Sequence, residues 1–201
     1  IAEICQCIQR INNILIDMNQ DFWAYISNDI FKLKLKDGEV GSSTMPHKVN
    51  PIDFENSEGN MGISNSLMGL FAEKLSKSRL QRDLSDSTVL RNLGMGFGYG
   101  YLGIVSCVQG LDKIQPNKIK IFSELSNNWQ ILAEALQIVM KLEGYENAYE
   151  EIKRITRGQN LNEDSYLDIV NSLKISKESK SKLKKLTPHT YLGIASKLAK
   201  N

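Results

Sequence analysis

The chain has 201 residues, of which 41% are hydrophobic and 24% are charged, a balance ordinary for a soluble globular protein of one domain or two small ones. Lys and Arg number 25 and Asp and Glu 23, so the net charge of +2 gives no general case for nucleic acid or a membrane surface as a partner. The 3 cysteines lack paired metal-ligand spacing, so we expect free thiols in a reducing, cytoplasmic compartment. No signal peptide, initiator Met or helix cap precedes the first apolar pattern, so we expect part of a longer protein.

The first predicted element is a long helix over about residues 1–25. Its apolar residues recur alternately three and four positions apart, the spacing of a helix that packs in a bundle. They are Ile1, Ile4, Ile8, Ile11, Leu15, Met18, Phe22 and Tyr25. From residue 31 to 40 apolar and lysine side chains alternate and then reach an Asp-Gly pair, which predicts a short hairpin.

Residues 41–51 form a loop, bounded by Gly and Pro, that is dense in reactive side chains. Pro51 favours an extended Asn50 as the N-cap of the helix that follows. Lys48 and Asn50 lie two residues apart in an extended segment and point the same way. A cation and an amide beside a helix N-terminus form a pocket for a carboxylate.

This loop suits proton abstraction next to a carboxylate. Lys48 and Asn50 would stabilise the negative charge that develops on the substrate, and a serine, Ser42 or Ser43, would take the proton. A serine is a weak base, so this role requires strong local activation. An ordinary loop that ends in a helix cap explains each residue singly, but it does not explain why so many reactive groups share one stretch.

The pattern Ser42-Ser43-x-Met45-Pro46-x-Lys48-x-Asn50, followed by Glu55, resembles the signature loop of the fumarase/aspartase superfamily, whose members release fumarate by β-elimination. The longer run from residue 41 to 60 resembles the adenylosuccinate lyases in particular. The resemblance implies that Ser42 is the base for the succinyl Cβ proton, with Ser43 beside it. It also implies that Lys48 and Asn50 bind the succinyl carboxylates and stabilise the aci-carboxylate intermediate, and that Glu55 orients Lys48 or a histidine.

The general acid of these enzymes is a histidine in an N-terminal region that this chain lacks. Neither His47, at a variable position of the loop, nor His189, outside any matching motif, takes over that role. The resemblance therefore implies that the 201-residue chain alone is inactive.

Two more long helices are predicted, over about residues 51–75 and 87–111. The second contains five closely spaced glycines, but no strand precedes them, so a dinucleotide-binding loop is disfavoured. Residues 92–111 are uncharged and nearly long enough to span a bilayer. Their glycines and the lack of a second such span favour the buried core of a large helical bundle instead.

A phosphate site is predicted where these two helices meet. Arginines surround a serine and the first N–H groups of the second helix, an arrangement that suits phosphate; the residues are Arg79, Arg82, Ser87 and Arg91. The alternative is that the arginines pair with Asp83 and Asp86 on the surface. The spacing of Arg82, Ser87 and Arg91 resembles the arrangement that binds the nucleotide phosphate in adenylosuccinate lyases.

The character of the sequence changes after residue 111. We place residues 1–111 in a central helical-bundle domain and residues 112–201 in a small C-terminal helical domain, so the predicted fold is all-α. Shorter helices are predicted over about 118–126, 129–143, 148–157, 165–173 and 187–200. The lysines between 174 and 185 are interpreted as a solvated face, with a nucleic-acid patch as the alternative.

The resemblance implies conversion of adenylosuccinate to AMP and fumarate, and of succinyl-aminoimidazole-carboxamide ribotide to its carboxamide, in purine biosynthesis. It implies a homotetramer whose active sites combine residues of three subunits, and no metal or organic cofactor. Argininosuccinate lyase is one alternative, disfavoured by the predicted phosphate site. A non-catalytic helical-bundle relative is the other, disfavoured by the intact set of Ser42, Lys48 and Asn50.

Overall fold

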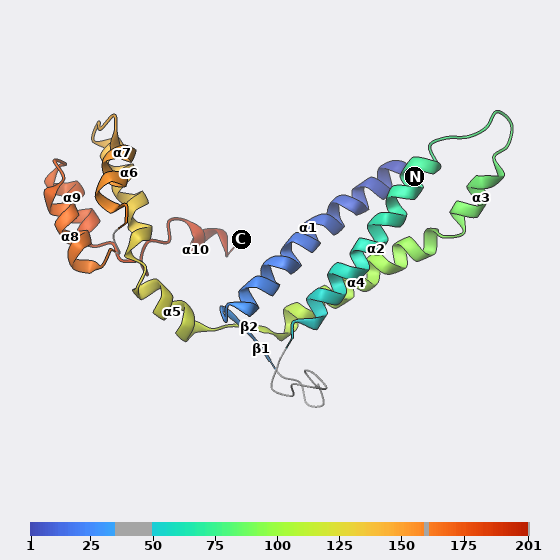
Figure 1. Ribbon diagram of the computed structural model, residues 1–201, viewed down its shortest axis with the longest axis horizontal. Helices are drawn as coiled ribbons and strands as arrows, with labels where there is room; N and C mark the ends of the chain where they lie inside the picture. The colour runs from blue at the N-terminus through green and yellow to red at the C-terminus, as the bar shows by residue number, and fades with distance from the viewer. Residues whose placement is uncertain (35–49, 159–160, 201) are drawn as a thin grey trace. The chain divides into compact units, whose positions relative to one another are not determined.

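The computed structural model describes residues 1–34, 50–158 and 161–200 (Figure 1). Within these ranges the chain is helical apart from two strands of three residues, which confirms the all-α prediction. The described residues form two compact units, residues 1–117 and 118–201. The assignment of residues 1–111 and 112–201 to domains of a larger enzyme stays a prediction.

The first unit is built on three long helices, α1 (Ala2–Ser27), α2 (Ile52–Lys74) and α4 (Leu93–Lys113). α2 packs along both of the others and runs antiparallel to each, whereas α1 and α4 scarcely touch (Figure 1). No helix of the described ranges is long and apolar enough to cross a membrane.

The predicted helix over 87–111 is wrong at its start, because the chain forms a short helix α3 (Leu84–Leu90) before α4. The Asn92 side chain donates to the carbonyl of Thr88 and Asn92 then caps α4. An Asn side chain that bonds nearby backbone competes with the helical ladder, so the helix ends there and restarts.

Large side chains of α2 fit onto glycines of α4. Each set repeats every seven residues: Phe54, Met61 and Met68 on α2 are fully buried against Gly110, Gly103 and Gly96 on α4. A Cβ atom at Gly103 would lie 2.6 Å from Met61 Cγ and 3.1 Å from the Ser57 carbonyl oxygen. These glycines therefore set how closely the two helices approach.

Two buried hydrogen-bonded chains cross all three helices, one heptad apart. Asn19 donates to Ser57 Oγ at 2.8 Å, and Ser57 donates to the carbonyl of Gly103 at 2.7 Å. The second chain, one heptad away, repeats the pattern with the bonds Asn12 to Ser64 (3.2 Å) and Ser64 to the Gly96 carbonyl (2.8 Å). Each serine accepts from α1 and donates to α4, so both of its roles are filled.

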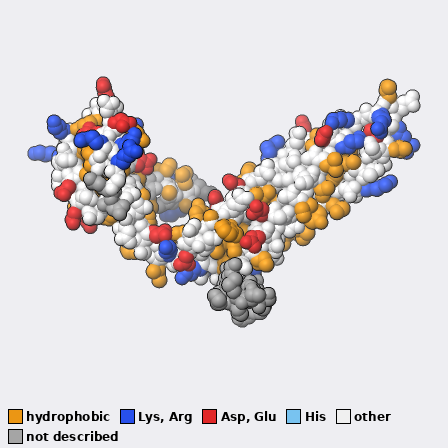
Figure 2. All heavy atoms as spheres, in the orientation of Figure 1, with side chains coloured by type: hydrophobic (Ala, Val, Ile, Leu, Met, Phe, Trp, Pro, Cys, Tyr) orange, Lys and Arg blue, Asp and Glu red, His pale blue; other side chains and the backbone are white. Residues whose placement is uncertain are grey.

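The predicted helix at the N-terminus is confirmed as α1, but the residues it buries differ from those expected. The buried residues of α1 are Cys5, Asn12 and Asn19, which follow one another at intervals of seven residues. The predicted apolar seam is half-buried or exposed, with Ile1, Ile4, Ile11 and Tyr25 among the exposed residues. Hydrophobic side chains of this unit are accordingly visible at its surface in Figure 2.

The two strands, β1 (Phe31–Leu33) and β2 (Ile114–Pro116), pair antiparallel, with Phe31 opposite Pro116 and Leu33 opposite Ile114. β1 follows α1 and β2 follows α4, so this pair ties together the adjacent ends of two helices that otherwise make little contact. The return strand of the predicted hairpin falls in residues 35–49, outside the described residues.

The second unit comprises short helices around its own core. They are α5 (Lys118–Ser126), the 3₁₀ helix η1 (Trp129–Leu132), α6 (Ala133–Leu142), α7 (Ala148–Thr156), α8 (Glu163–Ser172), α9 (Lys177–Lys184) and α10 (Ala195–Leu198). Tyr166 is fully buried in this core and donates to the Leu183 carbonyl at 2.9 Å, and burial raises the pKa of its phenol to about 12. Gly144 and Gly158 follow α6 and α7 with φ of +90° and +77°, as expected for glycines that end helices.

One helix of this unit was not predicted and one is shorter than predicted. The lysines between 174 and 185 lie largely at the surface as expected, but Ser176 also caps a helix there, α9, whose Leu183 is fully buried. The helix expected over 187–200 is reduced to the four residues of α10. A turn in which the Thr187 N–H donates to Thr190 Oγ1, and a left-handed Gly193, interrupt it.

We predict opposite effects of alanine at two glycines of α4. Gly103→Ala forces a Cβ against Met61 and should destabilise the chain by about 1–3 kcal/mol. Gly98→Ala meets nothing within 4 Å and should stabilise it by about 0.8–1 kcal/mol through helix propensity. Urea unfolding followed by circular dichroism measures both; equal effects of the two substitutions would contradict the packing described here.

Candidate active site

The predicted site residues divide between described and undescribed parts of the chain. Ser42, Ser43 and Lys48 lie in residues 35–49, outside the described residues. Asn50 and Glu55 follow directly, at the start of α2. Arg82, Ser87 and Arg91 lie at the other end of this unit, on and around α3.

Lys113, the last residue of α4, anchors the chain on both sides of residues 35–49. Its ammonium pairs with Asp53 at 2.7 Å, and both side chains are largely buried. Its carbonyl accepts the N–H of Lys34 at 2.7 Å. Lys34, just before residues 35–49, and Asp53, shortly after them, are thus bonded to the same residue.

Asn50 is not the N-cap that the sequence predicted. The helix begins at Ile52 with Pro51 as its N-cap, and Pro51 makes no side-chain cap bond. Asn50 therefore precedes the helix by one residue more than expected. Asn50 still lies two residues before Ile52, at the end of α2 that carries the positive part of the helix dipole.

Glu55, in the first turn of α2, accepts a hydrogen bond from a side chain of α1. Its Oε1 accepts the indole N–H of Trp23 at 3.0 Å. Three residues away on both helices, Glu58 Oε1 accepts from Gln20 Nε2, also at 3.0 Å. These four side chains line a pocket of about 220 Å³.

The sequence reading missed Trp23 and Gln20. Both lie outside the apolar seam of α1, and nothing in the spacing of that helix indicates which residue of α2 will lie opposite. In the sequence, these two residues could be recognised only as an amide and an indole N–H three residues apart, and therefore on one face of the helix.

The acidic residues near α3 form ion pairs with Lys74 of α2 and with Arg79, one of the arginines of the predicted phosphate site. Lys74 pairs with Asp83 at 3.0 Å and with Asp86 at 2.7 Å, and Arg79 pairs with Asp83 at 2.9 Å. Among the described residues no carboxylate pairs with Arg82 or Arg91. The surface ion-pair alternative thus holds for Arg79 but not for the other two arginines.

The N-terminus of α3 does not serve the phosphate as the sequence predicted. Asp83 caps it, accepting the backbone N–H of Ser85 at 3.0 Å and the Ser85 hydroxyl at 2.5 Å. A carboxylate at this position would repel a second anion. Ser87 instead lies within α3, one turn before Arg91, and donates to the Leu84 carbonyl.

The network around Asp83 shifts two pKa values. Hydrogen bonds from Ser85 and then from Lys74 hold the pKa of the Asp83 carboxyl well below its usual range. Hydrogen bonds to Asp86 and Asp83 raise the pKa of Lys74. Lys74 and Asp83 each favour the charged form of the other, and their ion pair joins α3 to the end of α2.

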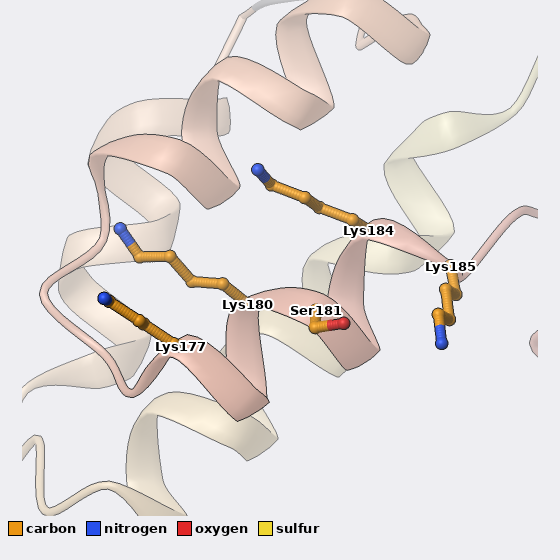
Figure 3. Close-up of a pocket in the computed structure, with 5 residues that line it drawn as sticks. All are labelled: Lys177, Lys180, Ser181, Lys184 and Lys185. Atoms are coloured by element: carbon orange, nitrogen blue, oxygen red, sulfur yellow. The ribbon is translucent and has the colours of Figure 1, made fainter.

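A lysine-rich surface of the second unit lies on α9. Lys177, Lys180 and Lys184 extend to one side of the helix and Lys185 to another, and with Ser181 they line a shallow hollow of about 420 Å³ (Figure 3). Lys180 donates to the Asn171 carbonyl at 2.6 Å. Lys177, Lys184 and Lys185 are exposed and Lys180 is half-buried, which agrees with the interpretation of these lysines as a solvated face.

The three cysteines are free, as the sequence predicted, and burial raises the pKa of the Cys107 thiol. Over residues 1–34, 50–158 and 161–200, no three His, Cys, Asp or Glu side chains come together as a metal would require.

Comparison with known families decides the relationship. The family model described as "Adenylosuccinate lyase C-terminal" matches residues 78–192, more than half of the chain. The chain belongs to the adenylosuccinate lyase C-terminal family. A second model, described as "Lyase", matches residues 1–69, which include the predicted signature loop.

Individual adenylosuccinate lyases also match the chain over all or nearly all of its length. The adenylosuccinate lyase of Legionella pneumophila strain Corby is 54% identical over 200 residues, which are 100% of this chain and 44% of the relative. That of Escherichia coli K12 is 49% identical over 195 residues, 97% of this chain and 43% of the relative. The chain thus spans less than half the length of these adenylosuccinate lyases.

The fold is that of the wider superfamily. A class II fumarase from Schistosoma mansoni superposes with a TM-score of 0.68 at 19% identity, over 96% of this chain and 39% of the fumarase. At that identity the likeness concerns the fold alone, and it agrees with the predicted all-α fold.

We predict that Asp83 titrates below the ordinary aspartate value of about 3.9. Its lowered pKa means that the stability it contributes is present above pH 3.9 and is lost only as the pH falls through the lower value of the folded chain. Carbon-detected NMR of the carboxyl groups measures this midpoint. In Lys74→Met the Asp83 midpoint should rise, and an unchanged midpoint would contradict the role given to Lys74.

Proposed function

We propose that the intact protein containing this chain is an adenylosuccinate lyase, which releases fumarate by β-elimination from adenylosuccinate and from succinyl-aminoimidazole-carboxamide ribotide in purine biosynthesis. The 54% identity with an adenylosuccinate lyase over the full length of the chain is the observation that carries the proposal. The intact residues of the signature loop support it. No metal or organic cofactor is required by this chemistry.

In this proposal the residues around the start of α2 perform the elimination. Ser42 removes the succinyl Cβ proton, with Ser43 beside it, and Lys48 and Asn50 stabilise the charge of the aci-carboxylate. Glu55 orients Lys48 or a histidine supplied by the rest of the enzyme. The anchoring of both flanks of residues 35–49 on Lys113 supports this arrangement, because catalysis requires the loop to return to one position.

Arg82, Ser87 and Arg91 bind the nucleotide phosphate. Arg82 and Arg91 carry charges that no described carboxylate neutralises, so an incoming phosphate would not have to displace a partner. This site also argues against argininosuccinate lyase, whose substrate has no phosphate. Capping by Asp83 means that arginines, and not the helix N-terminus, attract the anion.

We propose further that the intact enzyme is a cytoplasmic homotetramer with active sites formed by three subunits. α1 and α4 leave an apolar groove of about 200 Å³ between them, and its lining is almost wholly hydrophobic; it comprises Ile8, Ile11, Asn12, Phe97, Gly100, Tyr101 and Ile104. A patch of this kind on a soluble protein favours association. The alternative of a non-catalytic bundle protein predicts no turnover by the intact protein.

The function is tested with the intact enzyme and the Ser42→Ala variant. The parent should release fumarate from adenylosuccinate, measured by absorbance. Ser42→Ala should lower kcat by about 10²- to 10⁴-fold while substrate still binds, because general-base assistance is worth that much. The 201-residue chain alone should be inactive. Normal turnover by Ser42→Ala would show that Ser42 is not the general base, and Ser43 would then be the first residue to test in its place.

The phosphate site is tested by AMP binding to the intact enzyme. Charge-assisted bonds contribute about 1.5–3 kcal/mol, so Arg91→Ala should raise the Kd for AMP by one to two powers of ten. Arg79→Ala is the matched control, because Arg79 is already paired with Asp83, and its Kd should change by less than about threefold. Fumarate binding should not change in either variant. Calorimetry that gives both variants the same AMP affinity would contradict the assignment.

A further inference from the structure

Only one oxygen of Glu55 is engaged within the described residues. Oε1 accepts the indole N–H of Trp23, and none of the described residues donates to Oε2. A carboxylate can accept several hydrogen bonds, so Oε2 is available to a second donor. Which oxygen is available, and in which direction, is fixed by the bond to Trp23.

Trp23 is well suited to hold a carboxylate in one orientation. Its N–H can only donate, and it does not change protonation in the physiological range. The two helices are packed together at this point, since Phe22 stacks on Phe54 with ring centroids 5.3 Å apart. One turn earlier, Asn19 bonds the buried Ser57. The indole, itself 46% exposed, is thus carried by a stretch of α1 that is joined to α2 on its buried side.

We propose that Trp23 is a positioning residue of the active site. Its N–H holds Oε1 of Glu55, which leaves Oε2 for the second donor that the proposed function gives to Glu55. The inference rests on the proposed function, because it takes the role of Glu55 from there. It adds α1 to the elements that determine the geometry of the reaction.

The competing explanation is that the bond only joins two helices. The neighbouring bond from Gln20 to Glu58 provides the control, because it links the same helices through a neutral N–H and a carboxylate at the same distance of 3.0 Å. If both bonds only join the helices, loss of either bond should change kcat to the same extent. A positioning role predicts that only loss of the Trp23 bond affects turnover.

The first experiment compares Trp23→Phe with Gln20→Met in the intact enzyme. Each variant keeps a side chain of similar shape and removes the donor. Trp23→Phe should lower kcat between about tenfold and a hundredfold with KM within about twofold, because the lost bond acts on the reacting groups more than on substrate binding. Gln20→Met should leave kcat within about twofold. Equal kcat in the two variants would overturn the proposal.

The second experiment asks whether Trp23 acts through Glu55. In the Glu55→Gln background, Trp23→Phe should cause little further loss of kcat, because the group that it positions is already changed. Losses that multiply in the double variant would show that Trp23 acts independently of Glu55 and would contradict the proposed route.

The third experiment tests the contact in the 201-residue chain, without any activity. The chain has 2 tryptophans, so ¹⁵N-labelled indole gives two N–H signals, and Trp129 in the second unit serves as the reference. Glu55→Gln should shift the Trp23 signal and leave that of Trp129 in place. No shift in the Trp23 signal would overturn the proposal whatever the enzyme does. A shift together with an inactive parent enzyme would instead overturn the proposed function and keep the contact.

Discussion

The close approach of α2 and α4 is the constraint on which the first unit depends. Phe54, Met61 and Met68 occupy the space that side chains at Gly110, Gly103 and Gly96 would fill. Because both sets repeat every seven residues, the helices meet along one straight seam over most of their length. Close packing at this seam brings the backbone of α4 within reach of side chains on α2, which is what the buried serines require.

The two hydrogen-bonded chains define the register of the three helices. A shift of one residue would remove Ser57 and Ser64 from the carbonyls of Gly103 and Gly96 and leave buried polar groups without partners, at about 1–3 kcal/mol each. The chains are not perfect, because Asn19 Oδ1 is buried and has no partner among the described residues. Polar groups of this kind contribute less to stability than to the choice of a single alignment.

The sequence predicted the elements of this unit better than their contacts. Periodicity located α1 and α2, and a motif located the signature loop, because both depend on neighbours in the chain. The sequence did not indicate which residues of α1 face α2, since a 3.5-residue pattern marks an apolar line but does not show that Asn12 and Asn19 will meet serines. In the second unit, α9 was missed because its lysines conceal the single buried contact of Leu183. Both omissions concern tertiary partners, which one sequence read alone does not contain.

The same reasoning explains how the candidate active site is supported. The chemistry proposed for it is concentrated in residues 42–50, but the described residues that bond Lys34, Asp53 and Glu55 around that stretch come from α1 and from the end of α4. Lys113 and Asp53 form a largely buried ion pair, and loss of one partner from such a pair costs about 3–5 kcal/mol. Trp23 fixes the carboxylate that follows the loop. The glycine seam sets the position of Lys113 relative to α2, and the register of α1 sets the position of Trp23. Substitutions in the helical core, far from any reacting atom, should therefore alter turnover by displacing these two residues.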